Sequence, residues 1–200
     1  MKDATEIIVI IDESASMQKL TKETVASFNN FLKEQKALPD KATMSLTFFN
    51  TVHRQPYICA NLKDIKPLDR NSYTPNDYTA LLDAVGSTID SVGTRLAALC
   101  DSDRPCRVVV VIITDGEENS SKEYSLDQVK NKIKEQQEKY SWKFIFLGAN
   151  QDAFTVAGGL SIPCSNAMKY PSTGLGVQTA YRAAGQSVSS YRGGGSVAIN

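Results

Sequence analysis

Two uninterrupted apolar runs constrain the fold of this chain more than any other feature. Residues 7–11 read IIVII, and residues 107–113 read RVVVVII. A strand with one face in solvent alternates apolar and polar residues, whereas a strand of a parallel sheet that helices cover on both faces is apolar throughout. The two runs therefore predict two strands at the centre of one parallel sheet.

Segments with strand and helix periodicity alternate along the remaining sequence, which indicates a layered α/β fold. Residues 43–51 and 55–60 are expected to pair as a hairpin with its turn at residues 52–54, which adds one antiparallel edge strand. Further strands are expected at residues 142–147 and 167–170. Helices are expected at residues 20–37, 79–96, 151–160 and 174–191. One more helix is expected after the Ser-x-x-Gln capping box at residues 125–128. The predicted fold class is a doubly wound, mostly parallel central sheet with one antiparallel edge strand and helices on both faces.

Both apolar runs end in side chains that carry oxygen. Asp12, Ser14 and Ser16 follow the first run, and Asp115 follows the second within the sequence TDGEE. In open parallel sheets, ligands bind at the carboxyl ends of strands where the strand order reverses, so Asp12 and Asp115 are expected to share a crevice if their strands are adjacent. Thr79, at the start of a predicted helix, would face the same crevice. Hard oxygen ligands of this kind favour Mg²⁺ or Mn²⁺ over zinc.

These residues resemble the von Willebrand factor A (VWA) domain with its metal-ion-dependent adhesion site (MIDAS), of the stand-alone cytoplasmic type. The motif of that family reads Asp-x-Ser-x-Ser, then Thr, then Asp, and the chain matches it at Asp12, Ser14, Ser16, Thr79 and Asp115. The resemblance covers about residues 5–150. It implies a Rossmann-like VWA fold in which the three hydroxyls coordinate the ion, the two aspartates hold it directly or through water, and a carboxylate of a partner takes the sixth position.

The bulk composition fits one soluble domain and argues against two classes of partner. Lys plus Arg and Asp plus Glu both number 22, whereas binders of nucleic acid or anionic membranes carry a basic surplus. The apolar stretch of the N-terminal MKDATEIIVI is too short for a signal peptide or a membrane span, so a cytoplasmic location is expected. The four cysteines lack metal-knuckle spacing, so free thiols are expected. We expect a single domain at residues 1–192 and a flexible Gly-rich tail at residues 193–200. The segment from residue 153 onward contains no Asp or Glu.

Each candidate ligand also has a structural explanation. Asp12 and Ser14 could be turn and helix-cap residues, Thr79 could be an N-cap, and Asp115 with Gly116 could form a turn. Glu117 and Glu118 are expected in solvent, and Trp142 is expected in the core. Taken alone, the structural explanation is favoured for Asp12 and Ser14, but the joint pattern over three loops favours a metal site.

The main hypothesis is a non-catalytic, Mg²⁺-dependent protein-binding module that captures an acidic side chain of its partner. The first alternative is a metal-dependent phosphohydrolase with Asp12 as the nucleophile. Phosphatases of the haloacid-dehalogenase type need a second aspartate two positions later, and this chain has Ser14 there. The second alternative is a structural protein that self-associates through its acid-free C-terminal region.

Overall fold

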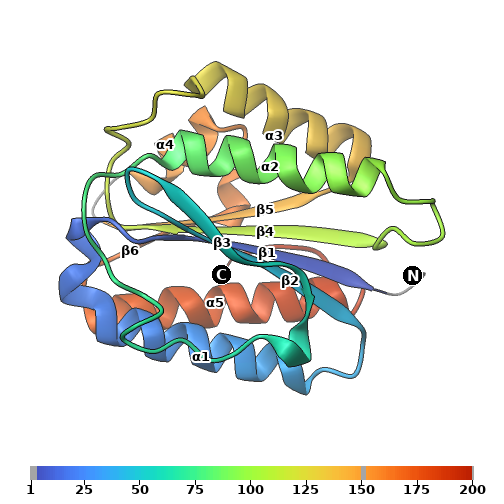
Figure 1. The fold of residues 1–200 in the computed structure, drawn as a ribbon, viewed down its shortest axis with the longest axis horizontal. Helices are drawn as coiled ribbons and strands as arrows, with labels where there is room; N and C mark the ends of the chain where they lie inside the picture. Colours follow the sequence, from blue (N-terminus) through green and yellow to red (C-terminus); the bar gives the residue numbers. More distant parts are fainter. Residues whose placement is uncertain (1–3, 150–151, 200) are drawn as a thin grey trace.

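The computed structural model describes residues 4–149 and 152–199, and within them a six-stranded sheet has the order β3-β2-β1-β4-β5-β6 (Figure 1). The strands are β1 (Thr5–Asp12), β2 (Ala42–Phe49), β3 (His53–Asn61), β4 (Arg107–Thr114), β5 (Lys143–Ala149) and β6 (Ala167–Tyr170). The edge strand β3 runs antiparallel to β2, and the other neighbouring strands pair in parallel. The predicted fold class is confirmed.

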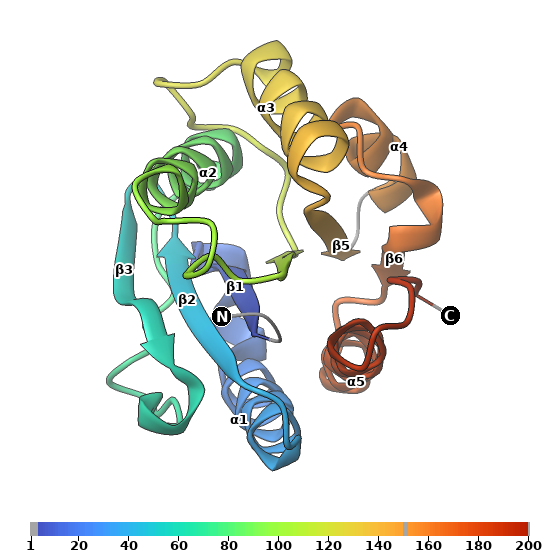
Figure 2. The ribbon, with the colours of Figure 1, turned by 90° about the vertical axis from the view of Figure 1, so that its right-hand side faces the viewer.

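Helices form a layer on each face of this sheet. Figure 2 shows α1 (Thr21–Ala37) and α5 (Gly174–Arg192) side by side on one face, with α2 (Leu81–Ala97), α3 (Leu126–Tyr140) and α4 (Ala153–Gly159) on the other. Short 3₁₀ helices lie at Ala15–Leu20, Leu62–Asp64 and Cys164–Asn166. None of the described helices is long and apolar enough to cross a membrane.

The absence of alternation in β1 follows from this two-sided cover. Ile7, Val9 and Ile11 belong to the core under α1 and α5, while Ile8 and Ile10 belong to the core under α2 and α3. The side chains of β4 divide between the same two cores. Because helices cover both faces, these strands are apolar on both faces over most of their length.

The strand order reverses between β1 and β4. From β1 the chain builds β2 and β3 on one side and then crosses over to place β4 on the other side of β1. The parallel register sets Ile11 opposite Ile113, so the next residues of both strands emerge at the same edge of the sheet. The last residue of β1 and the first residues after β4 are thus neighbours at the topological switch point.

The hairpin of β2 and β3 is less regular than predicted. Its turn lies at residues 50–52, because the Asn50 side chain accepts a hydrogen bond from Val52 N at 3.0 Å and Asn50 N donates to Val52 O at 2.9 Å. The register of β3 shifts twice along β2, and Cys59 has a left-handed φ of 47°. Pro56 also lies within this strand.

Two helix starts differ from the sequence expectation, and one cap agrees with it. Helix α2 begins at Leu81, two residues after the predicted Thr79. Helix α4 begins at Ala153, and its predicted first residue, 151, lies outside the described residues. The capping box of Ser125 and Gln128 is confirmed by hydrogen bonds in both directions. The four cysteines are free thiols.

The segment expected as a tail contacts the domain over its described part, residues 193–199. Ile199 N donates to Ser165 O at 2.8 Å, Ala198 N donates to Ser187 Oγ at 3.1 Å, and Val197 is buried. The segment has no regular secondary structure. Its flexibility in solution stays a prediction, and residue 200 lies outside the described part of the chain.

Candidate metal centre

The predicted ligands lie in three loops at the carboxyl edge of the sheet. Asp12 is the last residue of β1, Asp115 directly follows β4, and Thr79 lies two residues before α2. Ser14 and Ser16 lie where the chain turns from β1 into the 3₁₀ helix. The strand ends therefore fix the two carboxylates, and the loops bring the hydroxyls to them.

The side-chain oxygens of these residues converge. Ser14 Oγ and Ser16 Oγ are 3.0 Å apart, and the Ser16 hydroxyl donates a short hydrogen bond to Asp115 Oδ1. A Cβ atom added to Gly116 would lie 2.9 Å from Thr79 Oγ1, 3.4 Å from Ser16 Oγ and 3.8 Å from Asp12 Oδ2. One small cradle, kept open by the glycine, is thus surrounded by oxygens that come from both strand ends and the loop before α2.

Both carboxylates are buried, and neither forms an ion pair with a described residue. Asp12 is 0% and Asp115 is 6% exposed, and within the described residues neither forms an ion pair with Lys, Arg or His. Burial raises the pKa of Asp12, the negative charge of Asp115 raises it further, and hydrogen bonds from Ser14 and Thr114 oppose both effects. Burial also raises the pKa of Asp115, against the hydrogen bond from Ser16 and the positive charge of Lys19. Buried carboxylates are normally paired with a cation or coordinate a metal.

The donor set fits a hard divalent cation. In the described part of the chain, no group of three or more His, Cys, Asp or Glu side chains is placed to hold a metal ion. An ion at this edge would therefore depend on the hydroxyls of Ser14, Ser16 and Thr79 in addition to the two carboxylates. Oxygen-only ligands of this kind suit Mg²⁺ or Mn²⁺.

Neither Ser14 nor Thr79 has the capping role that would explain it without a metal. Ser14 occupies the N-cap position of the 3₁₀ helix, but its side chain makes no capping hydrogen bond. The N-cap of α2 is Ala80, so Thr79 is not the cap residue. Asp12 does close a local turn, because its Oδ1 accepts from Ser14 N at 2.7 Å.

Three residues that support the site were not identified from the sequence. Thr114 Oγ1 donates to Asp12 Oδ2 at 2.6 Å, Tyr73 OH donates to Asp12 O at 2.6 Å, and Asn119 Oδ1 accepts from Thr79 N at 2.9 Å. The hydroxyl of Thr114 at the end of an apolar strand was a signal that sequence reasoning could have used. Tyr73 and Asn119 lie in loops, where sequence spacing gives no position in space.

The remaining acidic residues near the site have structural roles. Glu13 is buried and pairs with Arg54 at 2.8 Å, so its carboxylate does not belong to the cradle. Glu118 is half-buried, and its carboxylate accepts hydrogen bonds from Leu82 N at 2.9 Å and Ser121 N at 2.8 Å. It therefore does not lie fully in solvent, contrary to the expectation from the sequence. Glu117 is exposed, as expected.

No family model matches the chain, and no curated protein matches it in sequence. Its fold is similar to that of the von Willebrand factor domain of the type V pili tip protein Mfa5 from Porphyromonas gingivalis. The two chains are 9% identical, the match covers 94% of this chain and 96% of that domain, and the TM-score is 0.64. The ArnB paralog VWA2 from Sulfolobus acidocaldarius is 18% identical over 78% of this chain and 37% of its own, with a TM-score of 0.51.

Proximal thread matrix protein 1 from the mussel byssus has a similar fold as well. It is 14% identical, and the match covers 90% of this chain and 47% of that chain with a TM-score of 0.63. A structure of the same mussel protein has a zinc-occupied MIDAS motif, and its TM-score to this chain is 0.61 at 15% identity. This chain thus spans about half the length of the mussel protein. At these identities the similarity defines the fold alone, which is the VWA fold.

Proposed function

We propose that the protein is a non-catalytic, metal-dependent protein-binding module. Asp12, Ser14, Ser16, Thr79 and Asp115 would hold Mg²⁺ or Mn²⁺ at the carboxyl edge of the sheet. When bound, the ion supplies a positive charge that attracts an acidic side chain of a partner protein. The observation that carries this proposal is a pair of buried carboxylates that form no ion pair with a described residue, next to hydroxyls that surround an open cradle.

The protein itself contributes position and charge to this site. Thr114 holds Asp12 Oδ2, and Tyr73 holds the backbone oxygen of Asp12, so this carboxylate has one orientation. The hydroxyl of Ser16 is the most accessible of the five groups, while the other four residues are buried. The site is therefore rigid at its base and open on the side of Ser16, which is the side that a partner would approach.

The residues around Asp12 also support a non-catalytic role. Its Oδ1 accepts from Ser14 N at 2.7 Å and its Oδ2 accepts from Thr114 Oγ1 at 2.6 Å. Each oxygen keeps a lone pair for a metal ion, but a phosphatase of the haloacid-dehalogenase type has a second aspartate two positions after its nucleophile, and this chain has Ser14 there. We therefore expect no metal-dependent hydrolysis of p-nitrophenyl phosphate by the purified protein.

Calorimetric titration with Mg²⁺ and with Mn²⁺ tests the site directly. Asp12→Asn keeps the size of the side chain and removes its charge, and it should weaken metal binding about 100-fold or more, since even outer-shell substitutions cost 10- to 100-fold. Asp101→Asn is the matched control, because the Asp101 side chain is 93% exposed and should leave the affinity unchanged. Equal affinity in Asp12→Asn and in the unmodified chain would disprove the site.

Capture of the partner forms the second arm of the test. Proteins that bind the immobilised chain in Mg²⁺ and are released by a chelator are tested again with their surface Asp and Glu residues replaced by Asn and Gln. One acidic residue of the partner should be essential. Binding that persists in both the chelator and Asp12→Asn would show that this surface is not the interface.

A further inference from the structure

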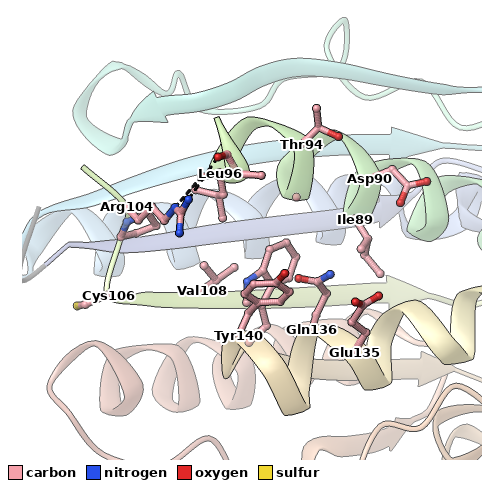
Figure 3. A pocket seen from close by; sticks show the side chains of 14 residues that line it. Ile89, Asp90, Thr94, Leu96, Arg104, Cys106, Val108, Glu135, Gln136 and Tyr140 are labelled. Carbon is pink, nitrogen blue, oxygen red and sulfur yellow. Dashed lines mark hydrogen bonds between the residues drawn. The ribbon is translucent and has the colours of Figure 1, made fainter. Parts of the chain in front are cut away.

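A cavity lies at the opposite edge of the sheet from the candidate metal centre. It has a volume of about 380 Å³ and opens between the C-terminal parts of α2 and α3 (Figure 3). The apolar side chains of its floor are Ile89 and Leu96 of α2, Val108 of β4 and Trp142, which directly precedes β5. All of these are buried in the core. The cavity thus has a dry floor and the size of a small-molecule site.

Gly93 keeps this cavity open. Glycine inside a helix is destabilising relative to alanine. On the same helix, Gly86 has a packing reason, because a Cβ there would lie 2.5 Å from the ring of Tyr124. Gly93 has neither a positive φ nor a neighbour, since an added Cβ would meet no atom within 4 Å. Gly93 therefore leaves space in the cavity that a side chain would fill.

The side chains of Gln136 and Trp142 offer polar groups to a ligand. The side-chain amide of Gln136 and the indole N–H of Trp142 make no hydrogen bond with another described residue, and neither is among the enclosed polar atoms. Figure 3 shows the Gln136 amide pointing from α3 toward α2. The cavity therefore offers N–H donors and one carbonyl acceptor beside an apolar floor.

The charged residues of the lining already have partners. Asp90 pairs with Lys132 at 2.6 Å, Arg104 pairs with Asp101 at 2.8 Å, and Glu135 pairs with Lys139 at 2.8 Å. Arg104 also donates to Leu96 O at 2.9 Å. An ionic ligand would have to displace one of these partners or remain unpaired over an apolar floor, which is unfavourable. The site is therefore suited to an uncharged molecule.

We propose that this cavity binds a small, uncharged, planar aromatic molecule that carries an amide or carbonyl group. Its ring would lie on the apolar floor between α2 and α3, and its polar group would bond Gln136 and the indole N–H of Trp142. Binding here requires no metal and is separate from capture of a protein partner at the other edge of the sheet.

Trp142 makes the test specific to this cavity, because it is the one tryptophan of the chain. Benzamide serves as the probe, and its binding is followed by Trp142 emission in the presence of a chelator, which removes any contribution of the metal centre. We expect a saturable change in emission. Benzoate has nearly the same shape but carries a charge, and it should bind at least about fivefold more weakly. Gln136→Leu should weaken benzamide about five- to tenfold through loss of a hydrogen bond.

Gly93→Leu fills the cavity and should abolish the response to benzamide. Gly158→Leu is the matched control, because Gly158 is an exposed helical glycine of α4 whose added Cβ would also meet no atom within 4 Å, and it should leave the response unchanged. Gly93→Ala is a milder variant that reduces the affinity with less change in volume. Far-UV circular dichroism verifies the fold of each variant. Absence of a saturable change, equal binding of benzoate and benzamide, or full binding by folded Gly93→Leu and Gly93→Ala would each overturn the proposal.

Discussion

At the scale of single residues, Gly116 determines how much room the oxygens of the candidate metal centre leave. Its φ is not in the left-handed region, so the backbone itself would accept alanine. The restriction comes from space alone, because a Cβ would lie 2.9 Å from Thr79 Oγ1 and 3.4 Å from Ser16 Oγ. A side chain here competes with a bound ion for the same cradle.

Gly116→Ala should therefore weaken Mg²⁺ binding about tenfold or more while the fold persists. Substitutions of residues that only orient the ligands of a metal already cost about 10- to 100-fold in affinity. Calorimetric titration measures the affinity, and thermal unfolding measures the stability. Gly158→Ala is the control, since its added Cβ meets no atom within 4 Å. If Gly116→Ala binds the metal as tightly as the unmodified chain does, the cradle is not the ion site.

At the scale of elements, the loop between β4 and α3 is fastened to the first turn of α2. The carboxylate of Asp83 accepts hydrogen bonds from the backbone N–H groups of Lys122 at 2.8 Å, Glu123 at 2.9 Å and Tyr124 at 2.8 Å. The negative charge also lies in the first turn of the helix, where the helix dipole favours it. The same loop carries Asn119, which accepts from Thr79 N, so Asp83 helps to position a predicted metal ligand.

Asp83→Ala should destabilise the protein by about 2–3 kcal/mol, because three hydrogen bonds to a charged acceptor are lost in a half-exposed loop. Urea unfolding measures this change. Hydrogen exchange should increase at residues 117–125, and Mg²⁺ affinity should fall through Thr79. Asp101→Ala, at a side chain that is 93% exposed, is the control. Unchanged exchange in the loop would show that Asp83 does not hold it.

At the scale of the whole molecule, much of the fold could be predicted because buried parallel strands have a distinct pattern. The apolar runs of β1 and β4 identified the sheet centre, and the residues that follow them placed Asp12 and Asp115 at one edge. The contacts of Tyr73 and Asn119 could not be predicted, because they depend on the paths of irregular loops. The cavity beside Gly93 has the same origin, since its lining comes from separate elements whose packing no local pattern records.

The segment after α5 gives a prediction at this scale. A chain that ends at Arg192 loses the burial of Val197 and the hydrogen bonds of Ala198 and Ile199. Part of this stabilisation is offset by the entropy of ordering the segment, so the net loss should be about 1 kcal/mol, or about 2–4 °C in Tm. Calorimetric unfolding of both chains measures the difference. An unchanged Tm would agree instead with a tail that contributes nothing to the fold.

The irregularity of β3 has a consequence for crowded solutions. A long, flat edge strand exposes unpaired N–H and C=O groups that template fibrils, whereas bulges and proline interrupt such a template. This edge carries two register shifts and Pro56, and the other edge, β6, spans four residues. Neither border of the sheet offers a continuous ladder to a neighbour, so the folded protein should resist amyloid formation at high concentration.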